Sequence, residues 1–189
     1  DVEYNSSTDF DGTPFTIFHF NDNKEEQDQT SIEVRYSSTF SDRFNFVVGV
    51  NQFQQEYSIG ERRNFFIALN AATYSETEHD TFGVFGEINF NVTDALSVTA
   101  GGRWTKEEKS IDIGILGSCE LDFSSCTNNA SNEKDWSNFS PKVSAQYQFT
   151  DDMMAYASWT RGFASGVFNA RAATLDAVGP TNPESVDSL

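Results

Sequence analysis

Alternation of apolar and polar residues, in segments joined by very short turns, is the feature that most limits how this chain can fold. In residues 139–149 the apolar side chains fall mainly on every second position, with Ser, Lys and Gln between them. A β-strand sends these two sets to opposite faces. After a polar turn at 150–152, residues 153–163 alternate in the same way. This stretch predicts a β-hairpin with one apolar and one polar face.

The same unit occurs three times along the chain. Paired strands are predicted at about 30–40 and 44–54, 81–92 and 96–106, and 139–149 and 153–163, and a further strand begins at Glu184. The turns within the hairpins, near residues 42, 94 and 151, are short and contain Asp. The connections between hairpins are longer, and we expect loops at about 1–28, 55–80, 107–136 and 164–183.

This asymmetry between short turns and long connections indicates a membrane barrel. Outer-membrane barrels have short periplasmic turns, long extracellular loops and girdles of aromatic residues at both interfaces. A membrane β-strand needs only about 9–11 residues, whereas a membrane helix needs an apolar run of about 18 or more, which the sequence lacks. Two aromatic belts are predicted: Phe44, Phe90, Tyr147 and Phe149 beside the short turns, and Trp104, Phe139, Trp159 and Phe163 toward the long loops.

Charge and composition argue against several classes of protein. Asp and Glu number 29 against 12 Lys and Arg, for a formal net charge of −17, whereas a nucleic-acid partner needs a basic face. The acidic residues gather at 22–28, 76–80 and 107–108, which we interpret as solvated loop. No stretch has the spacing of a calcium-binding loop, so no metal site is predicted.

The cysteines and histidines do not suggest a catalytic centre. Cys119 and Cys126 lie in a Ser- and Asn-rich segment, and two cysteines without a nearby His are too few for a zinc site. A disulfide between them is favoured over two free thiols, which implies an oxidising compartment. His19 and His79 lie far apart in sequence, with no Ser or Cys in a recognisable nucleophile setting. The chain is therefore expected to be no enzyme and to bind no cofactor.

Six segments, in order and with consistent spacing, resemble the barrel of TonB-dependent outer-membrane receptors. They are Ile32 to Arg35 with Ser37 and Ser38, Phe85 to Ile88, Leu96 to Thr105, Phe139 to Val143, Ala155 to Gly166 with Phe168 and Asn169, and Pro183 with Glu184. The resemblance covers residues from about 29 to 189.

The resemblance implies an all-β fold, an antiparallel up-and-down transmembrane β-barrel segment of about six strands from a larger 22-stranded barrel. Residues 1–189 would then be a partial receptor barrel whose plug is absent from this sequence. An open sheet of six strands would leave unpaired backbone groups in hydrocarbon, so we expect a fragment.

The implied function is energy-coupled uptake of a ferric siderophore or other bulky nutrient across the outer membrane of a Gram-negative bacterium. The implied partners are outer-membrane lipid, the remainder of the same barrel and its plug, the TonB complex through that plug, and the ligand, with no nucleic acid. Two alternatives remain: a passive porin-like or structural barrel, and a soluble secreted β-sandwich that binds glycans.

If the chain is a barrel, ligand recognition belongs to the extracellular loops and the lumenal side chains near their mouths. The candidates are cationic and aromatic: Tyr57, Arg62, Arg63, Trp136, Arg161 and Arg171. Such groups suit anionic, chelated or sugar-like ligands. Each of them could instead anchor the membrane interface or solubilise a loop.

Two residues constrain the predicted strands further. Alternation puts Arg161 on the face of Trp159, which is tolerable only if the hydrocarbon ends near Trp159. Pro141 removes a ladder donor, and Pro is tolerated at the first residues of a strand. We therefore expect pairing to begin around Pro141 or after it. Glu33, Arg35, Glu87, Arg103 and Lys142 have lumenal parity and are expected to pair across neighbouring strands.

Overall fold

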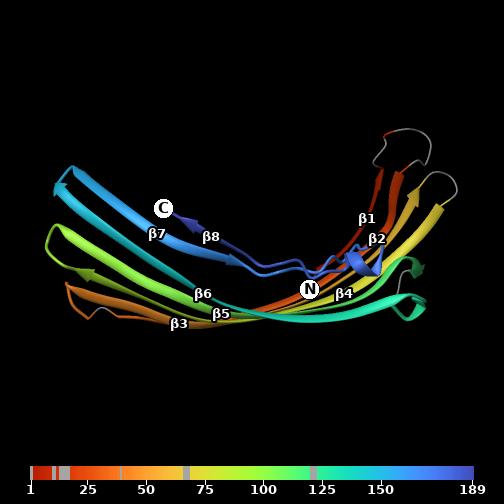
Figure 1. Cartoon of the computed structure of the whole chain (residues 1–189), viewed down its shortest axis with the longest axis horizontal. Coiled ribbons are helices and arrows are strands. Elements are labelled where there is room, and N and C mark those ends of the chain that lie inside the picture. The colour runs from red at the N-terminus through yellow and green to blue at the C-terminus, as the bar shows by residue number, and fades with distance from the viewer. Residues whose placement is uncertain (1, 10–11, 13–17, 39, 66–68, 120–122) are drawn as a thin grey trace.

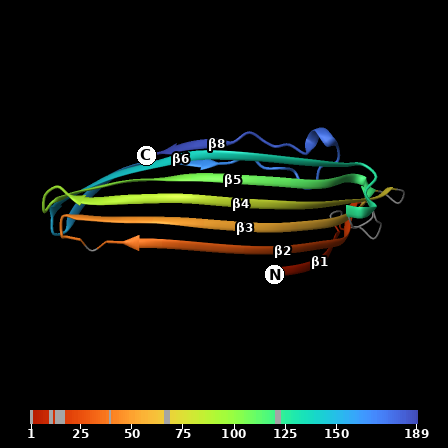
Figure 2. The same cartoon turned by 90° about the horizontal axis from the view of Figure 1, so that it is seen from below.

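The computed structural model describes residues 2–9, 12, 18–38, 40–65, 69–119 and 123–189. Within these ranges, eight strands form one antiparallel sheet in sequence order. They are β1 (Val2–Asp9), β2 (Phe18–Ser37), β3 (Phe44–Phe65), β4 (Leu69–Asn91), β5 (Leu96–Cys119), β6 (Asn129–Thr150), β7 (Met153–Ala164) and β8 (Glu184–Ser188). Every strand pairs with its sequence neighbour, as Figure 2 shows. The all-β, up-and-down prediction is confirmed, and one continuous sheet excludes two packed sheets for this part of the chain.

The short turns lie together at one end of the sheet, between β2 and β3, β4 and β5, and β6 and β7 (Figure 1). We call this the turn end. Strands β3, β5 and β7 start at residues 44, 96 and 153, where the alternation placed them. At the turn end, Phe44 pairs with Phe90. Among the described residues no helix is long and apolar enough to cross a membrane.

The loop predictions at 1–28, 55–80 and 107–136 are wrong over most of their length. β3 continues to Phe65, β4 begins at Leu69, and β5 and β6 together pair over most of the third range. The acidic run at 76–80 is part of strand β4, so its side chains alternate between the faces of the sheet. Glu76 and Glu78 lie on one face, and Thr77 and His79 lie on the other. Polar side chains on both faces therefore marked strand beyond the apolar band rather than loop.

The two faces of the sheet differ in chemistry. One face, which we call the apolar face, carries many exposed apolar side chains in β2 to β6; examples are Val34, Val84, Trp104 and Phe139, which are 39 to 64% exposed. The opposite, polar face carries ion pairs and hydrogen bonds between side chains. The sheet curves along its strands, and residues 165–183 lie on its concave side (Figure 1).

Glycines on the polar face let side chains reach across a whole strand. Gly101 of β5 pairs with both Glu87 of β4 and Lys142 of β6, and the Lys142 ammonium contacts the Glu87 carboxylate over it. Gly83 similarly lies beneath the Arg103 Nη2 to Asn51 Oδ1 hydrogen bond of 2.8 Å. These contacts skip the middle strand because it has no side chain at that position.

Pro141 does not mark the start of its strand, so that expectation is wrong. β6 begins at Asn129, and Pro141 pairs with Gly102 of β5 within a continuous ladder. Pairing with β7, however, begins only at Lys142. Pro141 therefore lies just beyond the point where the second ladder ends, where a missing backbone donor is tolerated.

Candidate functional site

Residues 165–183, which we call the strap, connect β7 to β8 and fold back over the polar face. The strap contains a short 3-10 helix, η2 (Leu175–Ala177). Val178 and Ala172 of the strap pack with Ile111 and Ile113 of β5, and all four are at most 1% exposed. Full burial of a Val or Ile side chain contributes about 1.5–3 kcal/mol. The strap is therefore held by an apolar core of its own.

Gly166 lets the strap approach the sheet closely. A Cβ at this position would lie 2.1 Å from the Thr181 carbonyl oxygen and 2.7 Å from the Trp136 ring. Trp136 of β6 is 8% exposed and lies beneath this point. Backbone hydrogen bonds close the strap on itself, from Asn169 N to Val178 O at 2.8 Å and from Thr181 N to Val167 O at 2.9 Å.

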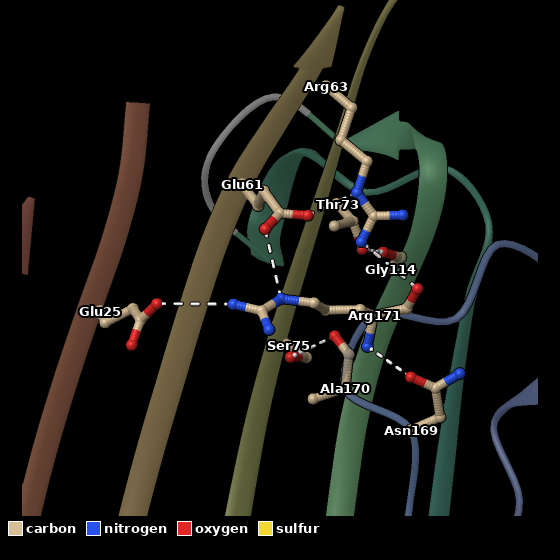
Figure 3. A network of polar contacts seen from close by, with 9 residues as sticks. All are labelled: Glu25, Glu61, Arg63, Thr73, Ser75, Gly114, Asn169, Ala170 and Arg171. Carbon is tan, nitrogen blue, oxygen red and sulfur yellow. Dashed lines mark hydrogen bonds and ion pairs between the residues drawn. The ribbon is translucent and has the colours of Figure 1, made fainter. Parts of the chain in front are cut away.

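A central polar network ties the middle of the strap to β2, β3 and β4 (Figure 3). Arg171 points between two carboxylates, with its Nε 3.2 Å from Glu61 Oε2 and its Nη2 3.5 Å from Glu25 Oε1. Arg63 Nε donates to the other oxygen of Glu61, and Arg63 Nη2 donates to the Arg171 carbonyl at 3.4 Å. Glu61 is fully buried, so two arginines balance a carboxylate that water does not reach.

Other side chains complete this network. Ser75 Oγ donates to the Ala170 carbonyl at 3.0 Å. The Arg63 guanidinium lies 5.3 Å from the centre of the Phe20 ring. Burial, followed by the hydrogen bond and negative charge of Glu25, raises the pKa of Tyr57 to about 12. The Tyr57 phenol therefore stays protonated at neutral pH and donates its hydrogen bond to Glu25.

A second polar cluster ties the start of the strap to β4 and β5. Lys109 Nζ donates to Ser165 Oγ at 2.7 Å and to the Gly166 carbonyl at 3.2 Å. Ser165 Oγ donates to Glu107 Oε2 at 2.6 Å, and the same oxygen lies 3.2 Å from His79 Nε2. Lys109 also lies 5.8 Å from the centre of the Trp136 ring.

The environment of this second cluster shifts two pKa values downward. Burial lowers the pKa of His79, and the nearby Lys109 charge lowers it further. Burial alone would raise the pKa of Glu107, but the Ser165 hydrogen bond and the Lys109 charge outweigh it and hold that pKa below its usual value. At neutral pH the cluster therefore contains neutral His79 and ionised Glu107.

The structure brings four of the six predicted ligand-binding residues to the strap. Tyr57, Arg63 and Arg171 meet in the central network, and Trp136 lies under Gly166. Arg62 lies on the opposite face of β3 from Arg63. The Arg63 and Arg171 charges are balanced by Glu61 and Glu25 rather than held open for an anion.

Arg161 is separate from the strap network. Its guanidinium binds Asp187 of β8 through two hydrogen bonds of 2.8 and 3.0 Å and lies 5.8 Å from the centre of the Trp159 ring. A bidentate pair compensates a charge at the edge of an apolar band. The position of Arg161 is consistent with an apolar band that ends near Trp159. The sequence did not predict Asp187 as its partner.

The aromatic residues predicted as belts lie at two levels of the sheet. Near the turn end, the Tyr147 and Phe149 rings are 4.7 Å apart. At the other level Trp104 pairs with both Val84 and Phe139, and its ring lies 6.4 Å from that of Phe82. Their role as membrane-interface anchors remains a prediction.

Sequence reasoning missed the residues that hold the strap: Glu25, Glu61, Ser75, His79, Glu107, Lys109 and Ser165. His79 was treated as a lone loop histidine, and Glu107 as part of a solvated acidic block. Within 76–80 the usable signal was the placement of acidic residues on every second position, whereas Glu107, Glu108 and Lys109 are consecutive and gave no such signal. Cys119 and Cys126 are joined by a disulfide in the structure. Within the described ranges no group of three or more His, Cys, Asp and Glu side chains is placed to hold a metal ion.

Comparison with known proteins identifies this architecture. The family model described as TonB dependent receptor-like, beta-barrel matches residues 1–189. This chain belongs to that family. The match includes the first 28 residues, which the sequence resemblance did not cover.

One solved structure illustrates the shared fold. The ferric yersiniabactin uptake receptor FyuA from Yersinia pestis superposes with a TM-score of 0.71 at 14% sequence identity. The superposition covers 89% of this chain and 25% of the FyuA chain. The chain therefore spans about a quarter of the solved receptor that it matches, and at this identity the similarity concerns the fold alone.

Proposed function

We propose that this chain is part of the wall of an outer-membrane transporter that takes up a bulky nutrient with energy supplied through TonB. The family match over residues 1–189 is the observation that carries the proposal. The finer proposal is a ferric siderophore as ligand, which is what FyuA is named for. A Gram-negative outer membrane is the implied location, and the complete protein would contact TonB through its plug.

The chemistry of the two faces supports a transporter wall. Exposed Val, Ile and Phe side chains on one face suit lipid, whereas the paired charges on the other suit a wet interior. The strap covers part of this interior face and carries Arg171, which is half exposed. A ligand that enters the lumen from the strap end would meet this segment. The inward-facing groups are arranged for recognition and positioning, and we assign them no chemical reaction.

Uptake by the complete receptor tests the proposal. A strain that lacks all other siderophore receptors is given the full-length gene and a panel of radiolabelled ferric siderophores. We expect saturable uptake of at least one of them, and this uptake should disappear in an otherwise identical strain without TonB. The matched control is the same strain with an empty vector.

The passive-barrel alternative makes a different prediction in the same experiment. A porin-like wall would admit small solutes at a rate proportional to their concentration, and deletion of TonB would leave that rate unchanged. Uptake of that kind would contradict energy coupling. A TonB-dependent signal with a different nutrient would keep the transporter and replace the siderophore.

A further inference from the structure

Besides its apolar core, the strap is attached to the sheet by two polar groups of side chains, and only the second of these groups contains a histidine. The central network joins Arg171 to Glu61 and Glu25. The second cluster, around Ser165 and Gly166, contains His79, Glu107 and Lys109. A histidine changes its charge between about pH 5 and 8, so that the second attachment is the one that mild acidification alters.

We propose that the strap is a gate over the polar face of the sheet and that protonation of His79 opens it. The name gate rests on the proposed transport function. The coupling between His79 and the strap rests on the contacts alone.

The charged groups around His79 show how protonation would act. From β5, Glu107 and Lys109 face His79, and Asp80 is its charged neighbour on β4. From the strap, the Ser165 hydroxyl donates a hydrogen bond to Glu107, which in turn contacts His79. From β3, the Phe53 ring lies 5.6 Å from the His79 ring, measured between ring centres. None of the groups from β3 or the strap supplies a second carboxylate.

Protonated His79 competes with the strap for one oxygen atom. Glu107 Oε2 accepts the Ser165 hydrogen bond and also lies 3.2 Å from His79 Nε2. A proton on the imidazole strengthens the His79 contact and draws Glu107 toward β4. It also adds a positive charge near Lys109, whose ammonium holds Ser165 and Gly166. Both effects weaken the attachment of the strap.

The direction of the pH dependence follows from linkage. With the strap closed, burial and Lys109 hold the pKa of His79 below its usual 6.5. Opening hydrates the imidazole and returns its pKa toward that value, so the open strap binds the proton more tightly. The closed strap therefore keeps its full stability above about pH 6.5 and loses it as the pH falls through this value toward the lower closed-state pKa.

Hydrogen exchange in the full-length receptor without ligand tests this coupling. The reporters are strap amides that donate hydrogen bonds within the strap: Val167, Asn169, Ala172 and Thr181. After correction for intrinsic exchange rates, we expect their protection to fall between about pH 8 and pH 5. The fall should approach tenfold for each unit by which opening raises the His79 pKa. Amides in the β4 and β5 ladder nearer the turn end should keep their protection.

Two histidine variants separate the proposed cause from general acid effects. His79→Gln keeps a hydrogen-bonding side chain but cannot become charged at these pH values, and its strap should show no pH step. His19→Gln removes the other histidine, which pairs with Asn64 of β3. This variant should keep the pH-dependent fall in strap protection. An equal step in wild type and His79→Gln, or no step in wild type, would overturn the proposal.

A second measurement covers the case in which His79→Gln does not fold. In the folded Lys109→Gln variant, which loses the donor to Ser165 and Gly166, strap protection should already be low at pH 8. Lys106→Gln, on the apolar face of the same strand, is the matched control. Normal strap protection in Lys109→Gln would contradict the attachment of the strap through the second cluster. Because no ligand is used, these results stand whether or not uptake is detected.

Discussion

At the scale of single residues, Glu61 is the group on which the strap most depends. It is fully buried and contacts both Arg63 and Arg171, and these two side chains balance its charge. Removing one partner from a buried ion pair costs about 3–5 kcal/mol, because the remaining charge stays buried without compensation. Glu25 also contacts Arg171, but its side chain is 29% exposed and water can replace it.

We therefore predict that Glu61→Ala releases the strap. In the full-length receptor, trypsin should cleave after Arg171 far faster in this variant than in wild type, because the arginine loses its buried partner. Glu25→Ala is the control. It should change cleavage little, since a partly exposed pair contributes about 1 kcal/mol or less. Equal cleavage in the two variants would mean that Glu61 holds the strap no more firmly than Glu25 does.

At the scale of elements, glycines in the middle of a strand determine which non-adjacent strands form side-chain contacts on the polar face. A Cβ at Gly83 would lie 2.3 Å from Asn51 Oδ1 and 2.7 Å from Arg103 Nη2, which are hydrogen-bonded to each other over this glycine. The contact joins β3 to β5 across β4. It adds a side-chain tie to a sheet in which every backbone ladder joins adjacent strands only.

Gly83→Ala should break this tie. The added methyl group would displace the ends of the Asn51 and Arg103 side chains, and loss of the partly buried hydrogen bond between them costs about 1 kcal/mol. We expect a lower midpoint for thermal unfolding of the detergent-solubilised receptor, followed by the gel mobility of the folded barrel. Gly162→Ala in β7 is the matched control, because its Cβ would lie 3.8 Å from the Val186 carbonyl oxygen, an ordinary van der Waals distance. An equal shift in both variants would show a general cost of alanine in strands.

The elements show where sequence reasoning succeeds and where it stops. Alternation located the hairpins and their turns because one face of the sheet is apolar and the other polar, and successive side chains of a strand point to opposite faces. It failed at 55–80 because both faces of the sheet there carry polar groups, so hydrophobicity loses its period although the ladder continues. The strap contacts could not be predicted, since pairs such as Ser75 with Ala170 depend on a chain reversal with no local signal.

The same limit applies to the candidate site. Tyr57, Arg63, Trp136 and Arg171 were selected for their chemical type, and the fold brings them to one segment. Their partners Glu61 and Glu107 were hidden within ordinary acidic sequence. The sequence could not reveal that Arg63 and Arg171 are paired with carboxylates, because this pairing depends on which strands lie side by side.

At the scale of the whole molecule, the sheet separates two environments. Val143 of β6 lies halfway between Phe139 and Tyr147. Its side chain is on the apolar face and is 44% exposed. Ser144, the next residue, faces the polar side and pairs with Thr99 and Ser158. These neighbours occupy almost the same height on the sheet, so a charge placed at each one compares the two faces directly.

We predict that Val143→Arg impairs assembly of the full-length receptor in the outer membrane and that Ser144→Arg does not. An Arg on the lipid face costs about 2–4 kcal/mol at the midplane of the bilayer and about 0–1 kcal/mol near its edge, whereas a lumenal Arg remains in water. The measurement is the fraction of receptor in outer-membrane preparations that migrates as a folded band before heating. If the two variants assembled equally well, the apolar face would not be the lipid-facing side, and the orientation of the strap toward a lumen would have to be abandoned with it.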